Sequence, residues 1–233
     1  MNRIIRLSGF FVFLMLSTTM GAQSRNQEIL RGEIAVELEP VYLIDLGINS
    51  PLDTETASNW ALEDTATAFS GMIYGWNFEY EPGERARQLG ERLNLQPIGT
   101  VKADDARIKI SDVSILDNVY YLWCDYHLAA DQQNRLRAWN SAQTKGIKAM
   151  GHAPLTGPAG TSARTMIKAA ALEDAIKQAL RAELRSTERN RPRFVRGSIA
   201  LAAFPLYRIF RGNWAAQASF RIRIDELVPY AVY

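Results

Sequence analysis

The stretch that decides the fold is residues 163–185, ARTMIKAAALEDAIKQALRAELR. Alanine is frequent in it, and Lys and Arg gather toward its end, where the helix dipole favours cations. A stripe of apolar residues recurs three or four positions apart, as on one face of an α-helix: Ile167, Ala171, Leu172, Ile176, Leu180 and Leu184. We therefore expect a long amphipathic helix that buries this face against another element.

Period-two alternation on both sides of this helix predicts β-strands. Residues 33–39, 107–110 and 119–128 alternate before it, and residues 198–210 and 214–225 follow it as a hairpin turned at Arg211-Gly212-Asn213. The chain is therefore expected to be an α+β protein with an antiparallel or mixed sheet. The long Ala-rich helix, about residues 163–185, is expected to pack on the apolar face of that sheet.

The segments between these elements carry weaker patterns. Residues 60–69 predict a short helix that Ser58 caps and Gly71 ends, and residues 72–80 predict a second strand. Residues 84–93 predict a polar helix. Residues 129–150 fit either a hairpin or a helix, and we favour the hairpin. Three Gly and two Pro within residues 151–162 predict a linker loop.

The composition limits the class of protein. A chain of 233 residues with 47% hydrophobic residues is long enough for a substantial core and is not typical of a disordered protein. Its single cysteine, Cys124, excludes a disulfide framework. No run of 18 apolar residues occurs, so no transmembrane segment is expected in the mature chain.

The first residues have the composition of a secretory leader. Arg3 and Arg6 precede an apolar run over residues 9–20, and the small residues Gly21 and Ala22 follow it. We interpret residues 1–22 as a signal peptide that is cleaved after Gly21 or Ala22. The mature protein is therefore expected to be exported, to the periplasm or as a secreted protein.

Charge is unevenly distributed along the mature chain. Residues 23–131 hold 8 Lys+Arg and 19 Asp+Glu, a net charge of −11, whereas residues 132–233 hold 17 and 6, a net charge of +11. The two parts either neutralise each other within one molecule or meet between molecules, and a basic surface for an anionic envelope polymer or lipid is a third interpretation. We divide the chain into an acidic half (residues 23–150), the linker (151–162) and a basic half (163–233), packed together as one domain.

The same charges suggest which strands pair. Glu33, Glu37 and Glu39 lie on the outer face of the first strand, and Arg221 and Arg223 lie on that of the last. Opposite charges on facing positions of paired strands are stabilising. We therefore expect the first and last strands to be neighbours.

Few residues suggest catalysis or metal binding. Alternation places Cys124 on the apolar face of its strand and both Asp125 and His127 on the other, so Cys124 is expected to be a buried structural thiol. Asp125 and His127 are the candidates for a hydrolase site. His127 and His152 lack the spacing of metal ligands and no phosphate-binding glycine motif occurs, so neither metal nor cofactor is expected.

We expect the protein to act by binding rather than by catalysis. Arginine is densest near the end of the long helix, and six arginines are expected to form a docking patch: Arg181, Arg185, Arg189, Arg191, Arg193 and Arg196. The leading hypothesis is an exported, non-enzymatic structural or assembly protein of the cell envelope, which contacts a protein partner or a second copy through complementary charge; nucleic acid is not expected as a partner. The alternatives are a hydrolase centred on Asp125 and His127, and a ligand-binding module that uses one aromatic strand face: Tyr74, Trp76, Phe78 and Tyr80.

Overall fold

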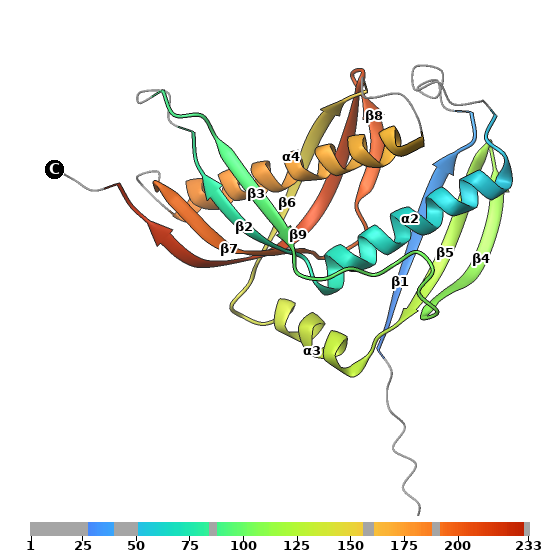
Figure 1. Ribbon diagram of the computed structural model, residues 1–233, viewed down its shortest axis with the longest axis horizontal. Coiled ribbons are helices and arrows are strands. Elements are labelled where there is room, and N and C mark those ends of the chain that lie inside the picture. Colours follow the sequence, from blue (N-terminus) through green and yellow to red (C-terminus); the bar gives the residue numbers. More distant parts are fainter. Residues whose placement is uncertain (1–27, 40–50, 84–87, 156–160, 188–191, 231–233) are drawn as a thin grey trace, which may run out of the picture.

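Two antiparallel sheets, each crossed by one long helix, form the structure, which is a computed structural model (Figure 1). It describes residues 28–39, 51–83, 88–155, 161–187 and 192–230. The three helices and nine strands of this part of the chain confirm the expected α+β class. None of these three helices combines the length and the apolar character that crossing a bilayer requires. The proposed signal peptide, residues 1–22, lies outside the described residues.

The smaller sheet has three strands in the order β1-β5-β4. These are β1 (Ile29–Glu37), β5 (Val119–His127) and β4 (Ile108–Leu116). Helix α2 (Thr54–Ile73) crosses this sheet, and Asp53 caps it by accepting a 2.7 Å hydrogen bond from the Thr56 backbone N–H. The helix buries its apolar face against Leu122 and Tyr126 of β5 and against β1.

The larger sheet is organised around its longest strand, β9 (Asn213–Val228). One edge of β9 pairs with β6 (Lys145–Pro154), and its other edge pairs first with β8 (Leu206–Phe210) and then with β7 (Phe194–Leu201). Strands β2 (Trp76–Glu81) and β3 (Arg92–Pro97) continue beyond β7. The β8–β9 turn confirms the predicted hairpin turn: Arg211 and Gly212 both have positive φ, as a two-residue turn of type I′ requires. The single strand expected over residues 198–210 is wrong, because β7 ends at Leu201 and β8 begins at Leu206.

Helix α4 (Thr161–Thr187) lies along the larger sheet and confirms the predicted long helix. Its buried side includes alanines at residues 171, 175 and 179, and these small side chains let it approach the sheet closely. The approach is closest at Gly151 of β6, where a Cβ atom would lie 2.0 Å from the backbone nitrogen of Ala175 and 2.4 Å from the carbonyl oxygen of Ala171. Gly151 therefore belongs to a strand that passes directly beneath the helix.

Helix α3 (Ala130–Trp139) connects the two sheets. Gln132 caps it by accepting a 2.9 Å hydrogen bond from the Ala129 N–H, and the Trp139 indole donates to the Ile73 carbonyl at the end of α2. Gln132 also donates to the hydroxyl groups of Tyr74 and Tyr126. The hairpin favoured for residues 129–150 is wrong, because these tertiary contacts stabilise a short helix followed by β6.

The predicted pairing of the first and last strands is also wrong. Strand β1 pairs with β5 in the smaller sheet, whereas both edges of β9 are occupied in the larger one. The charges concerned find other partners: Glu33 accepts a hydrogen bond from the Trp123 indole, and Arg223 forms an ion pair with Asp225 on its own strand.

Several predicted boundaries need correction. The helix predicted over residues 60–69 begins at Thr54, is capped by Asp53 instead of Ser58, and continues past Gly71 to Ile73. Of the segment expected to be the second strand, residues 72–80, only residues 76–80 form one, and this strand continues to Glu81. Residues 92–93 begin β3, so the predicted polar helix is absent from the described part of residues 84–93. Residues 151–154 of the predicted linker belong to β6.

The acidic and basic parts of the chain neutralise each other within the molecule at several described positions. Arg196 of β7 forms an ion pair with Glu79 of β2 at 2.9 Å, and the Arg181 guanidinium of α4 binds the Glu91 carboxylate, with Nε at 2.7 Å. Arg164 and Lys168 of α4 share the carboxylate of Asp64 on α2. At these residues the charge split serves intramolecular packing.

The close approach at Gly151 predicts the effect of adding one methyl group. G151A is expected to lower the free energy of unfolding by about 1–3 kcal/mol, because α4 must move away from β6. Urea denaturation measures this change. G90A is the matched control, since nothing lies within 4 Å of its Cβ position, and it should change stability by less than about 0.5 kcal/mol. Equal effects of the two substitutions would contradict the packing described.

Candidate functional site

Cys124 lies on one face of β5, and the two catalytic candidates, Asp125 and His127, lie on the other. Cys124 is 1% exposed on the inner face of β5, and burial raises the pKa of its thiol, as expected for a structural cysteine. Asp125 and His127 lie on the opposite face of the strand, where the Asp125 carboxylate pairs with Arg31 at 3.2 Å. The strand therefore separates the thiol from the imidazole, as its alternation predicts.

The aromatic row is largely covered. Tyr74 lies just beyond helix α2, not in the strand, and its hydroxyl accepts a hydrogen bond from Gln132. Phe78 and Tyr80 are each 1% exposed and pack with the apolar residues of α4. Trp76 alone among the three strand residues is partly exposed. Phe78 and Tyr80 thus belong to the core, and Tyr74 and Trp76 keep partly exposed surfaces.

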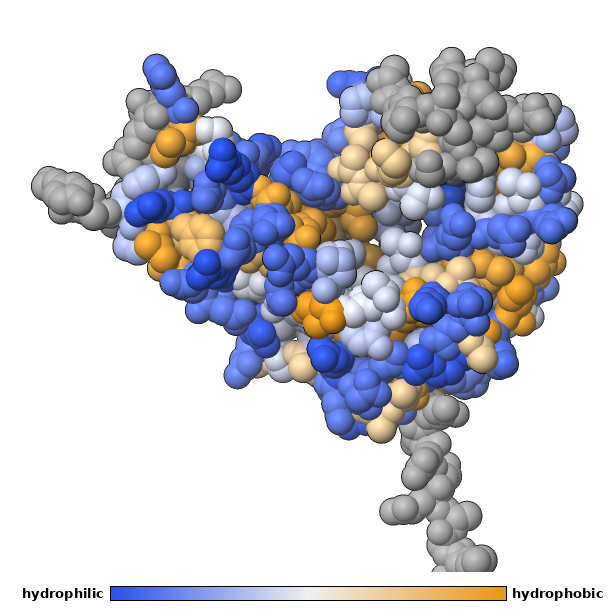
Figure 2. All heavy atoms as spheres, viewed as in Figure 1, coloured by the Kyte–Doolittle hydropathy of each residue, from blue (hydrophilic) through white to orange (hydrophobic). Residues whose placement is uncertain are grey.

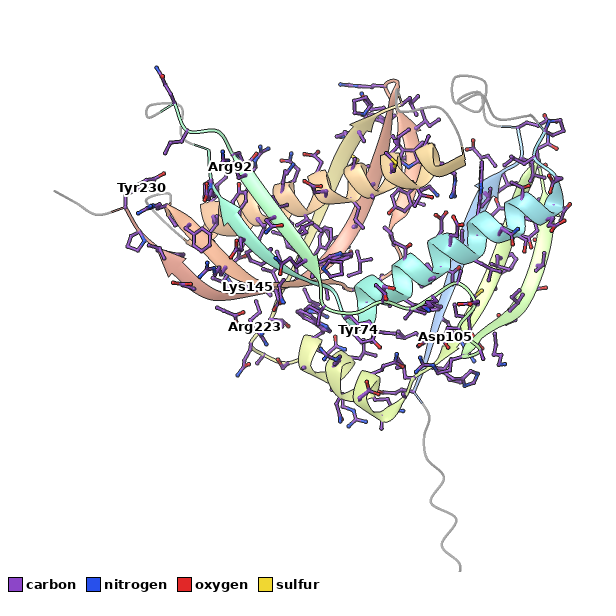
Figure 3. The ribbon with its side chains drawn as sticks, viewed as in Figure 1. Tyr74, Arg92, Asp105, Lys145, Arg223 and Tyr230 are labelled. Atoms are coloured by element: carbon purple, nitrogen blue, oxygen red, sulfur yellow. The ribbon has the colours of Figure 1, made fainter. Side chains whose placement is uncertain are left out.

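The arginines expected to form one patch are divided in the structure. Arg181 binds Glu91, and Arg196 bridges Glu79 and Glu226, whereas Arg185 is exposed at the end of α4. Arg189 and Arg191 lie outside the described residues. Arg193 joins Arg196 and Arg92 around an open hollow of about 760 Å³ at one end of the larger sheet, next to Phe194 and Tyr230 (Figure 3).

A second, more enclosed cavity lies between helices α2 and α4 and has a volume of about 240 Å³. Figure 2 shows the surface hollowed between the two lobes, with apolar residues exposed inside. Its wall combines residues from both sheets and from α4: Ile34, Trp76, Leu95, Leu172, Ile176 and Leu201. Asp64, Lys168 and Tyr207 supply polar atoms to the same cavity. We refer to this cavity as the interhelical cleft.

Three charged side chains are buried beside the interhelical cleft. Arg164 donates to both carboxylate oxygens of Asp64, with Nη1 at 3.1 Å from Oδ1, and Lys168 donates to Oδ2 at 2.5 Å. The exposed fractions of the side chains are 2% for Arg164 and 9% for both Lys168 and Asp64. With Lys168 protonated, this cluster carries a net charge of +1 in an environment of low dielectric constant.

Aromatic rings surround the two cations. The Arg164 guanidinium lies 4.8 Å from the centre of the Trp60 ring, and the Lys168 amine lies 4.8 and 5.5 Å from the rings of Tyr207 and Trp214. Such contacts stabilise desolvated cations. They replace only part of the lost hydration, since Arg164 Nε is buried without a hydrogen-bond partner in the described part of the chain.

Burial shifts the proton equilibria of this cluster. Desolvation lowers the pKa of Lys168 to about 8, although the Asp64 carboxylate acts in the opposite direction. Burial by itself would raise the pKa of Asp64, but Lys168 and Arg164 hold it below its usual value. Desolvation raises the pKa of Tyr207, which therefore stays neutral. The cleft thus presents a lysine amine whose charge changes near physiological pH.

Sequence reasoning missed this cluster, although one signal for it exists. Arg164 and Lys168 are four residues apart and fall on the same helical face as the buried Ala171 and Ala175. Cations at two positions of a buried stripe require a partner, because an unpaired buried charge is very costly. The partner, Asp64, lies 104 positions before Lys168 and cannot be identified from spacing.

The shifted pKa of Lys168 predicts how stability depends on pH. Between pH 8 and 10.5 the unfolded chain binds more protons than the folded protein at this position, so rising pH stabilises the folded state. The free energy of unfolding of the wild type should therefore increase relative to that of K168M as pH rises through this interval. Urea denaturation at several pH values measures the difference. K148M replaces an exposed lysine of β6, and its free energy of unfolding should depend on pH in the same way as that of the wild type. If the free energy of unfolding of K168M also showed the wild-type dependence on pH, the lowered pKa of Lys168 would be contradicted.

Comparison with known proteins indicates a family but no activity. No solved structure matches the chain significantly. An uncharacterized protein of Treponema pallidum (strain Nichols) is 26% identical over 180 residues, which cover 72% of this chain and 68% of that protein. A protein-family model, whose description names no function, matches residues 17–230. The chain therefore belongs to that family.

Proposed function

We propose that this protein is an exported, non-enzymatic binding protein, and that the interhelical cleft takes a small ligand with an apolar body and an anionic head. The observation that carries this proposal is a buried cluster with a net positive charge at the wall of a cavity that is lined mainly by apolar residues; Thr67, Thr165, Glu173 and Tyr207 are the other polar residues of the lining. The leader-like composition of residues 1–22 supports export.

The charge of the cluster favours an anionic group. Among the residues that the structure describes, Asp64 is the carboxylate that forms ion pairs with both cations, while Glu37 attracts Lys168 without an ion-pair contact. Lys168 lines the cleft and presents its amine there. A carboxylate placed beside this amine would complete the pairing and form a charge-assisted hydrogen bond.

The wall of the cleft favours a short apolar chain. Side chains from β1, α4, β2, β3 and the end of β7 line it, and most of them are aliphatic. Pockets for drug-sized molecules occupy roughly 300–1,000 Å³. The cleft, at about 240 Å³, fits a smaller body such as one medium-length acyl chain. Apolar burial then contributes affinity, while Lys168 selects the head group.

Arg164 and Asp64 act as positioning residues in this proposal. Arg164 is almost fully buried, and its guanidinium donates to both oxygens of the Asp64 carboxylate. One of these oxygens, Oδ2, also accepts from Lys168, which fixes the amine beside the Tyr207 and Trp214 rings. The lysine is therefore preorganised, and a ligand does not lose affinity by ordering it.

Octanoate tests this site. We expect octanoate to bind wild-type protein and to change the fluorescence of the tryptophans near the cleft, whereas octanol and acetate should bind at least tenfold more weakly. K168M should weaken octanoate binding by about 10–100-fold, since it removes a hydrogen bond between charged groups. Affinity should also fall as pH rises through 8, where Lys168 loses its proton.

K148M is the matched control, because it removes the charge of an exposed lysine far from the cleft lining. Its affinity for octanoate should equal that of the wild type. Equal binding of octanoate and octanol, or unchanged octanoate binding by K168M, would rule out the proposed role of Lys168.

The hollow at the end of the larger sheet favours a second candidate function, docking onto an anionic envelope surface. Arg92, Arg193 and Arg196 line it together with Glu81, Glu226, Phe194 and Tyr230. Arg196 forms an ion pair with Glu226, so Arg92 and Arg193 are the cations that suit a negatively charged surface with an apolar component. Wild-type protein should sediment with phosphatidylglycerol vesicles at low salt, and R193E should reduce this binding severalfold. R211E, in the exposed β8–β9 turn, changes charge equally and should bind more strongly than R193E. Equal losses of vesicle binding in R193E and R211E would show that the binding depends on net charge alone and not on this hollow.

A further inference from the structure

The edge of the smaller sheet is a further interaction surface. We propose that β4 pairs with β4 of a second copy of this chain across a two-fold axis, so that the two three-stranded sheets join into one sheet of six strands. The inference rests on an exposed apolar row along β4 and on a charge pattern that is complementary to itself. It is independent of the interhelical cleft.

Strand β4 is an edge that α2 leaves uncovered. It pairs with β5 on one side only, and Figure 1 shows no described element beyond it. Its inward-facing residues Ile110, Val113 and Ile115 are 50%, 43% and 53% exposed. They lie opposite inner-face residues of β5 that α2 and the core bury: Cys124, Leu122 and Tyr120. The apolar face of the sheet thus continues past its helix to an open edge.

The outer face ends at the same edge with an incomplete row of charges. Arg31 of β1 lies opposite Asp125 of β5, and Asp125 lies opposite Lys109 of β4. The signs alternate across the three strands and the row stops at Lys109. Asp112 is the next outward-facing residue of β4, because the bulge at residue 111 shifts the alternation. Neither Lys109 nor Asp112 has an ion-pair partner among the residues that the structure describes.

These two residues specify how the strand would pair with itself. In an antiparallel pair, residues that share a face lie opposite each other. The register that sets Lys109 opposite Asp112 of the second copy also sets Asp112 opposite the other Lys109, as two-fold symmetry requires. It further sets Ile108 opposite Val113 of the second copy, so these two apolar side chains meet on the inner face. The row of alternating charges formed by Arg31, Asp125 and Lys109 then continues with Asp112 of the second copy.

The second copy is a better occupant than an unrelated strand because of this complementarity. An unrelated strand would need to match only the apolar face of this edge. The edge also carries one cation and one anion, and a two-fold rotation places each of them opposite the residue of opposite charge in the second copy. The contact is isologous and closes at two chains, so it predicts a dimer and not a filament.

Sedimentation equilibrium across a range of protein concentrations tests the dimer. Wild-type protein should be dimeric, and K109D and D112K should each weaken association at least tenfold by placing like charges opposite each other. The double variant K109D/D112K exchanges the charges and should recover most of the wild-type association. V113K should give a monomer, because it places a charge in the apolar row.

I209K is the matched control, since Ile209 is an exposed apolar residue of β8 in the other sheet. It should leave the dimer intact. Circular dichroism checks that each variant is folded, and these positions are exposed enough to accept the changes. A wild-type monomer at every concentration, a dimer that persists in V113K, or no recovery in the double variant would overturn the proposal.

Discussion

The buried carboxylate of Asp64 links the helix that crosses the smaller sheet to the helix that crosses the larger one. It lies on the helix that crosses the smaller sheet, and both of its cationic partners lie on the helix that crosses the larger one. Burying such a group is favourable only when its hydrogen bonds are satisfied, and here two strong donors satisfy it. The pair of helices is therefore held in one relative position, and the interhelical cleft is the space that this position leaves.

The same interaction explains why the cleft is chemically distinctive. The close approach of α4 to Gly151 fixes how deeply the helix lies on β6, and so fixes the depth of Arg164 and Lys168. Because two cations share one anion, satisfying the hydrogen bonds of Asp64 leaves a positive charge in excess. Lys168, one of these two cations, lines the cleft, and desolvation weakens its hold on the proton.

Elements with strong local signals could be predicted from the sequence. The stripe of α4, the alternation of β5 and the Arg211-Gly212 turn determine their own structures, since each depends on periodicity or backbone conformation within a few residues. Residues 129–150 and the boundaries of α2 could not be predicted in this way. Their structures depend on contacts made far along the chain, such as the hydrogen bond from Trp139 to Ile73.

The site was harder to predict than the fold for a related reason. A hydropathy pattern treats Lys168 as a polar residue, although its four-carbon stem and its ring contacts place it in the buried stripe. Gly151 was interpreted as part of a loop because glycine commonly marks turns, whereas here it permits close packing. The uneven distribution of charge along the chain did indicate attraction between its acidic and basic parts. It could not show that one carboxylate, Asp64, is shared by two cations.

The most direct measurement for this account is an NMR titration of the Lys168 side chain, with its signal assigned by comparison with K168M. The account predicts a pKa of about 8 in the free protein and an upward shift when octanoate is added. A pKa near the ordinary value of 10.5 that octanoate does not change would contradict it.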